Sequence, residues 1–187
     1  GVMKFIKALL GRLIKSVLTI VFLLVLGIGG IWAWQIKPWL EAAELKEAKV
    51  KVDPERMKAE VKLFSERISP RPYRDHVFLL ATGKTIQTRF ETTKGKVEVQ
   101  KFKVLIEENG KEVPKEFFNV SCLFGEGKGK RLIVGAHYDG CDTTPGADDN
   151  ASGVAGLLEL AYMLDAEKDL PCEIELVAYS LEEPPFF

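Results

Sequence analysis

The chain has 187 residues, which is enough for one domain and an additional segment at roughly 150 residues per domain. A hydrophobic content of 47% and a charged content of 28% are ordinary for a globular protein that carries one extra apolar segment. The formal net charge of -1 gives no reason to expect nucleic acid as a partner.

The N-terminal part of the chain predicts a membrane anchor. Residues 1–15 form a basic tail with no acidic side chain, so the remainder carries 22 basic against 27 acidic residues. The uncharged stretch 16–36 would span roughly 30 Å as a helix, the hydrocarbon thickness of a bilayer. The positive-inside rule then predicts a cytoplasmic N-terminus and a periplasmic, extracellular or lumenal chain after Lys37. The far end of the span holds tryptophans, which favour the interface: Trp32, Trp34 and Trp39.

Two other interpretations of this segment are weaker. A cleaved signal peptide has a shorter apolar core, of roughly 7 to 15 residues, and a small-x-small cleavage site. Residues 31–33, Ile-Trp-Ala, make a poor site of that kind, so an uncleaved signal anchor is preferred. A buried soluble helix is disfavoured because apolar residues cover every face of the span.

Residues 37–52 are predicted to be a charged juxtamembrane spacer, and residues 53–187 a folded domain. The first helix of this domain begins with Asp53 as N-cap and Pro54 at the first helical position. Its apolar face at helical spacing consists of Met57, Val61, Phe64 and Ile68.

A second helix and two strands are expected next. The helix covers 75–86 and is interrupted or capped near Gly83. Within 97–104, apolar residues alternate on either side of a phase slip, which predicts a bulge or a bend. Residues 108–111 are a turn signal, and 117–124 are a second strand.

A βαβ unit is predicted after the glycine-rich segment 125–129. That segment lacks the Lys-Ser/Thr ending of a phosphate-binding loop and is interpreted as a turn. The unit comprises strand 131–136, a helix with one apolar face from Val154 onward, and strand 173–180, with a right-handed connection by default. Ligands and metals bind at the carboxyl ends of strands in such sheets.

Both strand ends of this unit carry side chains that can bind a metal ion. The loop 135–153 has the sequence Gly-Ala-His-Tyr-Asp-Gly-Cys-Asp-Thr-Thr-Pro-Gly-Ala-Asp-Asp-Asn-Ala-Ser-Gly, and Glu182 and Glu183 follow the next strand. Zinc takes imidazole nitrogen and carboxylate oxygen, and catalytic zinc sites leave one position for water. We therefore predict a zinc site at this sheet edge, with His137 as a ligand.

The positions of the carboxylates predict a different role for each of them in such a site. Asp139 is placed to accept the second ring N–H of His137 and to fix its tautomer. An aspartate such as Asp149 has two oxygens and can bridge two ions about 3.5 to 4 Å apart. Of the adjacent Glu182 and Glu183, one can bind metal while the other accepts a proton from activated water.

Each motif alone has a simpler interpretation. His137 alone would more often be a hydrogen-bonded structural histidine. The cluster 148–150 alone would most often cap a helix N-terminus, where acids are favoured, and the pair 182–183 would be solvated. A calcium loop that includes Asp142 lacks hand-like spacing. The metal interpretation is preferred because all three motifs fall at equivalent strand ends.

Three segments in this order resemble metallopeptidase family twenty-eight: Gly-Ala-His-Tyr-Asp, Pro-Gly-Ala-Asp-Asp-Asn-Ala-Ser-Gly and Glu-Glu-Pro-Pro-Phe-Phe. The family contains bacterial leucyl aminopeptidase, aminopeptidase Y and glutamate carboxypeptidase II. The resemblance is specific over 131–187 and extends to the helix at Asp53. It implies an α/β fold, with a doubly wound, mostly parallel sheet and flanking helices, that binds two zinc ions (Zn2+).

The resemblance also implies a role for each metal ligand. His137 would bind one zinc ion and Glu183 the other. Asp149 would bridge both ions, because it keeps the family's spacing to Ser152-Gly153. Asp148 is its main rival for that role.

The catalytic residues that the resemblance implies are Glu182, the general base, and Asp139, which would orient His137. The family supplies a further acidic ligand and a distal histidine after the Glu-Glu motif, and His76 fits neither position. We therefore expect 53–187 to be the N-terminal part of a zinc peptidase domain, truncated and inactive by itself.

The predicted function of the longer protein is that of a membrane-anchored, outward-facing zinc exopeptidase, an aminopeptidase acting on peptide substrates. A zinc cyclotransferase like glutaminyl cyclase is one alternative. A non-catalytic receptor or scaffold is another, disfavoured because such relatives tend to lose ligands. The sequence does not predict an oligomeric state. The cysteines lack Cys-x-x-Cys spacing and favour free or buried thiols: Cys122, Cys141 and Cys172.

Overall fold

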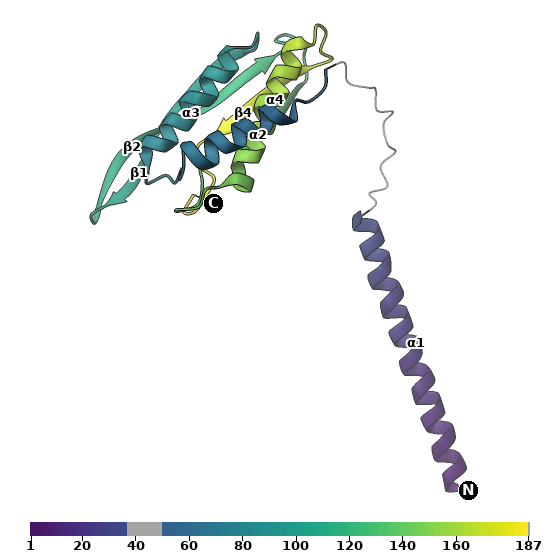
Figure 1. Cartoon of the computed structure of the whole chain (residues 1–187). Helices are drawn as coiled ribbons and strands as arrows, with labels where there is room; N and C mark the ends of the chain where they lie inside the picture. Colours follow the sequence, from purple (N-terminus) through teal and green to yellow (C-terminus); the bar gives the residue numbers. More distant parts are fainter. Residues whose placement is uncertain (37–49, 187) are drawn as a thin grey trace. The chain divides into compact units, whose positions relative to one another are not determined.

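The structure is a computed structural model that describes residues 1–36 and 50–186. The chain forms two compact units, Gly1–Glu47 and Ala48–Phe187 (Figure 1). Most of the predicted juxtamembrane spacer, 37–52, lies outside the described residues.

The N-terminal unit consists of one long helix. Helix α1 (Val2–Ile36) has 35 residues, and its large apolar side chains are exposed from Val2 to Trp34. Its length and composition make it a candidate membrane span, as predicted. Residues 2–15 of the basic tail belong to the same helix. Trp32 is also exposed near its end, and Trp39 lies outside the described residues.

The second unit is built on a mixed four-stranded sheet with the strand order β1-β2-β4-β3. The strands are β1 (Lys96–Glu108), β2 (Lys111–Phe124), β3 (Arg131–His137) and β4 (Glu173–Tyr179). The β1–β2 and β2–β4 pairs are antiparallel, and β3–β4 is parallel. Helix α4 (Gly153–Ala166) connects the parallel pair and completes the predicted βαβ unit. The α/β class is confirmed. Within the described residues, the β3–β4 pair is the parallel part of the sheet.

Helices pack on the sheet and enclose the core. In Figure 1, α3 (His76–Glu91) lies along the β1–β2 hairpin, and α2 (Pro54–Lys62) lies beside α4. Alternate residues of β2 point toward these helices, as do their partners on β4, because side chains alternate along a strand. The paired residues are Val120, Cys122 and Phe124 with Ala178, Leu176 and Ile174. The three cysteines are free, and burial raises the pKa of Cys122 to about 11.

Strand β1 is uninterrupted, so the predicted bulge is wrong. Its pairing with β2 is one-to-one over its whole length. The phase slip instead marks a change of the buried face of the strand, since alternate residues face opposite sides. The inward positions are first Val97 and Val99, and then Phe102, Val104 and Ile106.

Helix α3 is continuous, so the predicted interruption near Gly83 is also wrong. Gly83 is buried against the sheet. A Cβ atom there would lie 2.6 Å from the ring of Phe118 and 2.7 Å from the hydroxyl of Tyr138. The glycine permits close approach of helix and sheet rather than ending the helix.

The start of α2 agrees with the prediction, and a partly buried ion pair joins α2 to α4. The side chain of Asp53 accepts hydrogen bonds from the backbone N–H groups of Glu55 and Arg56. Nε and Nη2 of Arg56 donate to the two carboxylate oxygens of Glu159 in α4, at 2.7 and 2.8 Å. The chain continues from α2 into the π-helical turn η1 (Leu63–Arg67).

The predicted turns are also present. Asn109 and Gly110 join β1 to β2 with φ angles of 54° and 73°, the left-handed values that a two-residue hairpin turn requires. The glycine-rich segment 125–129 forms the loop before β3.

Candidate metal centre

The carboxyl ends of β3 and β4 bring three possible ligands to one place. His137 is the last residue of β3 and pairs with Tyr179, the last residue of β4. Asp149 lies in the segment η2 (Ala147–Ser152), and Glu183 follows β4. One ligand atom from each of His137, Asp149 and Glu183 lies within 4.8 Å of the others. A cation between them could therefore contact all three.

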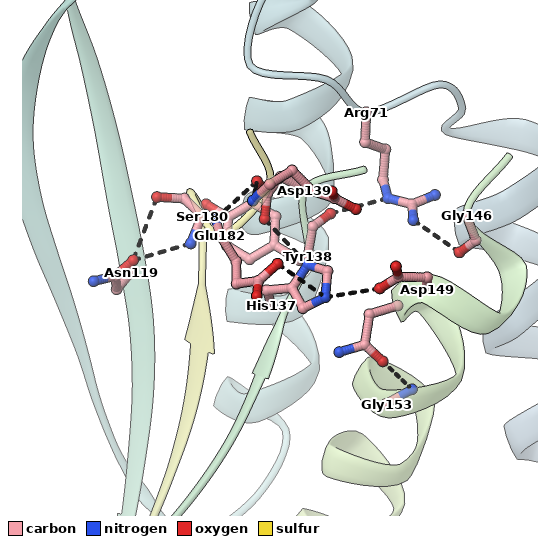
Figure 2. A network of polar contacts seen from close by, with 12 residues as sticks. Arg71, Asn119, His137, Tyr138, Asp139, Gly146, Asp149, Gly153, Ser180 and Glu182 are labelled. Carbon is pink, nitrogen blue, oxygen red and sulfur yellow. Dashed lines mark hydrogen bonds and ion pairs between the residues drawn. The ribbon is translucent and has the colours of Figure 1, made fainter. Parts of the chain in front are cut away.

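Asp139 organises both sides of this cluster, as Figure 2 shows. It is 1% exposed. Its Oδ1 lies 3.3 Å from Nδ1 of His137, and its Oδ2 accepts the backbone N–H groups of Glu182 and Glu183, each at 2.9 Å. One buried carboxylate thus orients the imidazole ring and fixes the backbone of both glutamates. The second of these contacts was not predicted from the sequence.

The ring of His137 is held with Nε2 toward the carboxylates. Nε2 lies 3.0 Å from Oδ1 of Asp149 and 3.7 Å from Oε2 of Glu182. The hydrogen bond with Asp139 raises the pKa of His137; burial opposes this effect, and the neighbouring negative charges add to it. With the ring proton on Nδ1, the lone pair of Nε2 is directed to the place where a metal would bind.

Glu183 carries an unsatisfied buried oxygen. The residue is 8% exposed, and its Oε1 has no hydrogen-bond partner in the described part of the chain. Burial raises the pKa of Glu183, and the negative charges of Asp149 and Asp139 raise it further. A buried carboxylate without a partner is costly, and buried charges are normally paired or coordinate a metal. The site therefore fits a cation, and its imidazole and carboxylate donors fit zinc.

In the loop before α4, neighbouring residues have different structural roles. Asp149 has φ -115° and ψ 92°, so its backbone leaves the helical conformation. Oδ1 of Asn150 accepts the backbone N–H of Gly153 at 3.0 Å and thus supplies the helix-capping interaction considered for the 148–150 cluster. Asp148 is exposed and lies outside the three-ligand group.

Several supporting residues were not singled out in the sequence. Asn119 accepts hydrogen bonds from the backbone N–H and the hydroxyl of Ser180, at 3.0 and 3.3 Å, just before Glu182 (Figure 2). Arg71 likewise donates from its guanidinium to the carbonyl oxygen of Tyr138 at 2.9 Å. These contacts join residues far apart in the chain, and no local pattern signals them.

An open cleft of about 510 Å³ lies beside the cluster. His137 and Glu182 line it together with the apolar side chains of Ile133 and Leu181. The side chain of Glu182 is 47% exposed. A substrate in the cleft would thus meet a carboxylate close to the ligand nitrogen of His137.

Comparison with known proteins gives the same family as the motifs. Residues 119–186 match peptidase family M28, which confirms the resemblance. The chain is 34% identical over 163 residues to the uncharacterized protein YfbL of Escherichia coli (strain K12). That alignment covers 81% of this chain and 46% of that protein, so the chain spans about half of its length.

Solved structures share the fold. Glutaminyl cyclase from Fimbriiglobus ruber has a TM-score of 0.62 and 21% identity, over 74% of this chain and 49% of that one. The zinc aminopeptidase BSAP from Bacillus subtilis has a TM-score of 0.60 and 14% identity, over 72% of this chain and 63% of that one. At these identities the likeness shows the α/β fold with flanking helices.

Proposed function

Because residues 119–186 match peptidase family M28, we propose that this protein is a zinc-dependent exopeptidase of the aminopeptidase type. The observation that carries the proposal is the buried, unpartnered Oε1 of Glu183 beside His137 and Asp149. Within residues 50–186 this oxygen has no hydrogen-bond partner, and the imidazole and carboxylate groups around it are the ligands that zinc prefers.

His137, Asp149 and Glu183 would hold the metal. A zinc ion bound there supplies Lewis-acid activation of water and of the scissile carbonyl group. Asp149 is proposed to reach a second ion as well, since a carboxylate has two oxygens for coordination. Asp139 keeps the imidazole in the tautomer that leaves Nε2 free to bind.

Glu182 is proposed as the general base. Its backbone N–H is fixed by Asp139, while its carboxylate is half-exposed at the cleft. In this position it would accept a proton from the attacking water and deliver that proton to the leaving amine. The exposure of Glu182 suits proton exchange, and the burial of Glu183 suits metal binding.

Membrane anchoring through α1 is part of the proposal. The helix is long and apolar enough to cross a bilayer, and the positive charges before its apolar stretch favour a cytoplasmic N-terminus. The peptidase domain would then act on peptides outside the cytoplasm.

Cyclisation of N-terminal glutamine is the second candidate activity. It is supported by the fold shared with glutaminyl cyclases, which reach the TM-score of 0.62 reported above. The two activities leave different products. A peptidase releases the first amino acid, whereas a cyclase releases ammonia and leaves the peptide intact.

The test is hydrolysis of aminoacyl anilides and of a glutamine-initiated peptide by the full-length protein, with and without a chelator. The proposal expects chelator-sensitive release of amino acids, reduced by two or more orders of magnitude in Glu182→Gln with zinc binding retained. The matched control is Glu107→Gln, an exposed glutamate on β1. Equal activity of the two variants would contradict the assignment of Glu182, and ammonia release alone would favour the cyclase.

A further inference from the structure

Arg71 is a fully buried side chain with an unusual set of partners. It lies between η1 and α3 and is 1% exposed. Buried arginines are usually paired with carboxylates. Within residues 50–186, however, Arg71 forms no ion pair, and its guanidinium donates instead to backbone carbonyl oxygens (Figure 2).

These carbonyl groups belong to two separate segments of the chain. Nε donates to Tyr138, between His137 and Asp139, at 2.9 Å. Nη1 donates to Pro145 at 3.0 Å, and Nη2 to Gly146 at 3.1 Å, immediately before the segment that carries Asp149.

Two further contacts fix the arginine itself. Nη1 also donates to the carbonyl oxygen of Phe64 in η1. The carbonyl oxygen of Arg71 accepts the backbone N–H of Gly140 at 3.0 Å. Arg71 therefore connects the helical layer to the loops on both sides of the metal cluster.

The loop is folded closely around the guanidinium. Gly146 has a φ of 57°, in the left-handed region that favours glycine. A Cβ atom at this position would lie 2.5 Å from the carbonyl oxygen of Asp149 and 2.8 Å from Nη2 of Arg71. Residues 142–145, by contrast, are exposed. Arg71 is thus the buried support for the position of Asp149.

We propose that Arg71 is a positioning residue that sets the separation between His137 and Asp149 and so preorganises the metal site. The inference rests on the proposed zinc function. Guanidinium suits this task because its planar fork of five N–H donors can serve several carbonyl groups in fixed directions. A lysine ammonium has three donors on one nitrogen and cannot span the same set.

The test compares zinc affinity with the stability of the metal-free full-length protein. Zinc affinity is measured by competition with a chromophoric chelator, and stability by thermal unfolding. Arg71→Lys is expected to lower zinc affinity by about 10- to 100-fold, as loss of an outer-sphere partner typically does. Arg89→Lys is the matched control, because Arg89 pairs with Glu60 in the helical layer. It should alter stability with little change in zinc affinity.

A second variant keeps the proposal testable if Arg71→Lys does not fold. Gly146→Ala places a methyl group against both Arg71 and the backbone of Asp149, so it should also weaken zinc binding. If both variants fold, their effects on affinity should be non-additive, since they disturb one contact. The proposal would be overturned if either variant folded, was as stable without metal as the Arg89→Lys control, and bound zinc with wild-type affinity. Failure of the wild-type protein to bind zinc would instead reject the proposed function.

Discussion

Both carboxylate oxygens of Asp139 accept hydrogen bonds, and Asp139→Asn replaces one of these two acceptors with an NH2 group. Oδ1 faces Nδ1 of His137, and Oδ2 accepts two backbone N–H groups, from Glu182 and Glu183. An asparagine side chain has one acceptor oxygen and one NH2 donor. It therefore cannot serve all three donors.

Either orientation of the new amide disturbs the site. If its oxygen keeps the two backbone N–H groups, the NH2 group faces Nδ1 of His137. That nitrogen must then accept, which moves the ring proton to Nε2 and blocks metal binding there. If the amide is reversed, the N–H groups of Glu182 and Glu183 lose their buried acceptor.

We expect Asp139→Asn to weaken zinc binding by about 10- to 100-fold, which corresponds to about 1.4 to 2.7 kcal/mol of binding free energy. The assay is chelator competition on the full-length protein, with thermal unfolding of the metal-free form to confirm that it is folded. Asp142→Asn is the control, because Asp142 is an exposed acid in the same loop. Equal zinc affinity of the two variants would refute the role of Asp139.

Four further predictions concern stability and anchoring. Glu159→Gln should lower the free energy of unfolding by about 1 to 2 kcal/mol at neutral pH, after allowance for the partial exposure of Arg56. The Arg56 hydrogen bond lowers the pKa of Glu159, so this difference should be complete above the unfolded value of about 4.3 and fade as pH falls through the folded pKa. Gly83→Ala should destabilise by about 1 kcal/mol, because overpacking outweighs the gain in helix propensity. Gly156→Ala, where a Cβ meets nothing within 4 Å, should stabilise by about 0.5 to 1 kcal/mol. Deletion of residues 1–36 should move the protein from the carbonate-washed membrane pellet to the soluble fraction.

Each of these predictions has an outcome that contradicts it. Denaturant titrations over pH 3 to 8 check the Glu159 pair, and a difference that is independent of pH would reject its electrostatic origin. Equal stabilisation by Gly83→Ala and Gly156→Ala would show that α3 and the sheet have spare room at Gly83. A truncated chain that stays in the washed pellet would mean that α1 is not the anchor.

The three-ligand cluster could be predicted because its geometry follows from strand direction. The parallel strands β3 and β4 end at one edge, so His137 and Glu183 meet there. Asp149 was preferred over Asp148 by family spacing, and the structure brings Asp149 to His137, whereas Asp148 lies outside the three-ligand group. Binding of metal by these side chains remains a prediction.

The supporting contacts could not be predicted, since they depend on long-range packing. The bond from Arg71 to Tyr138 joins positions 67 residues apart, and the Pro-Arg-Pro sequence around Arg71 indicates only the end of a helix. The errors at β1 and Gly83 have the same origin. A phase slip or a glycine describes the local chain, whereas the neighbouring element decides which face is buried.

The most direct measurement is anomalous diffraction at the zinc absorption edge from crystals of the zinc-loaded full-length protein. We expect an anomalous peak about 2.0 to 2.2 Å from Nε2 of His137 and from carboxylate oxygens of Asp149 or Glu183. A zinc-loaded crystal with no peak among these three residues, or with zinc bound only elsewhere, would contradict the metal centre and the exopeptidase function proposed from it.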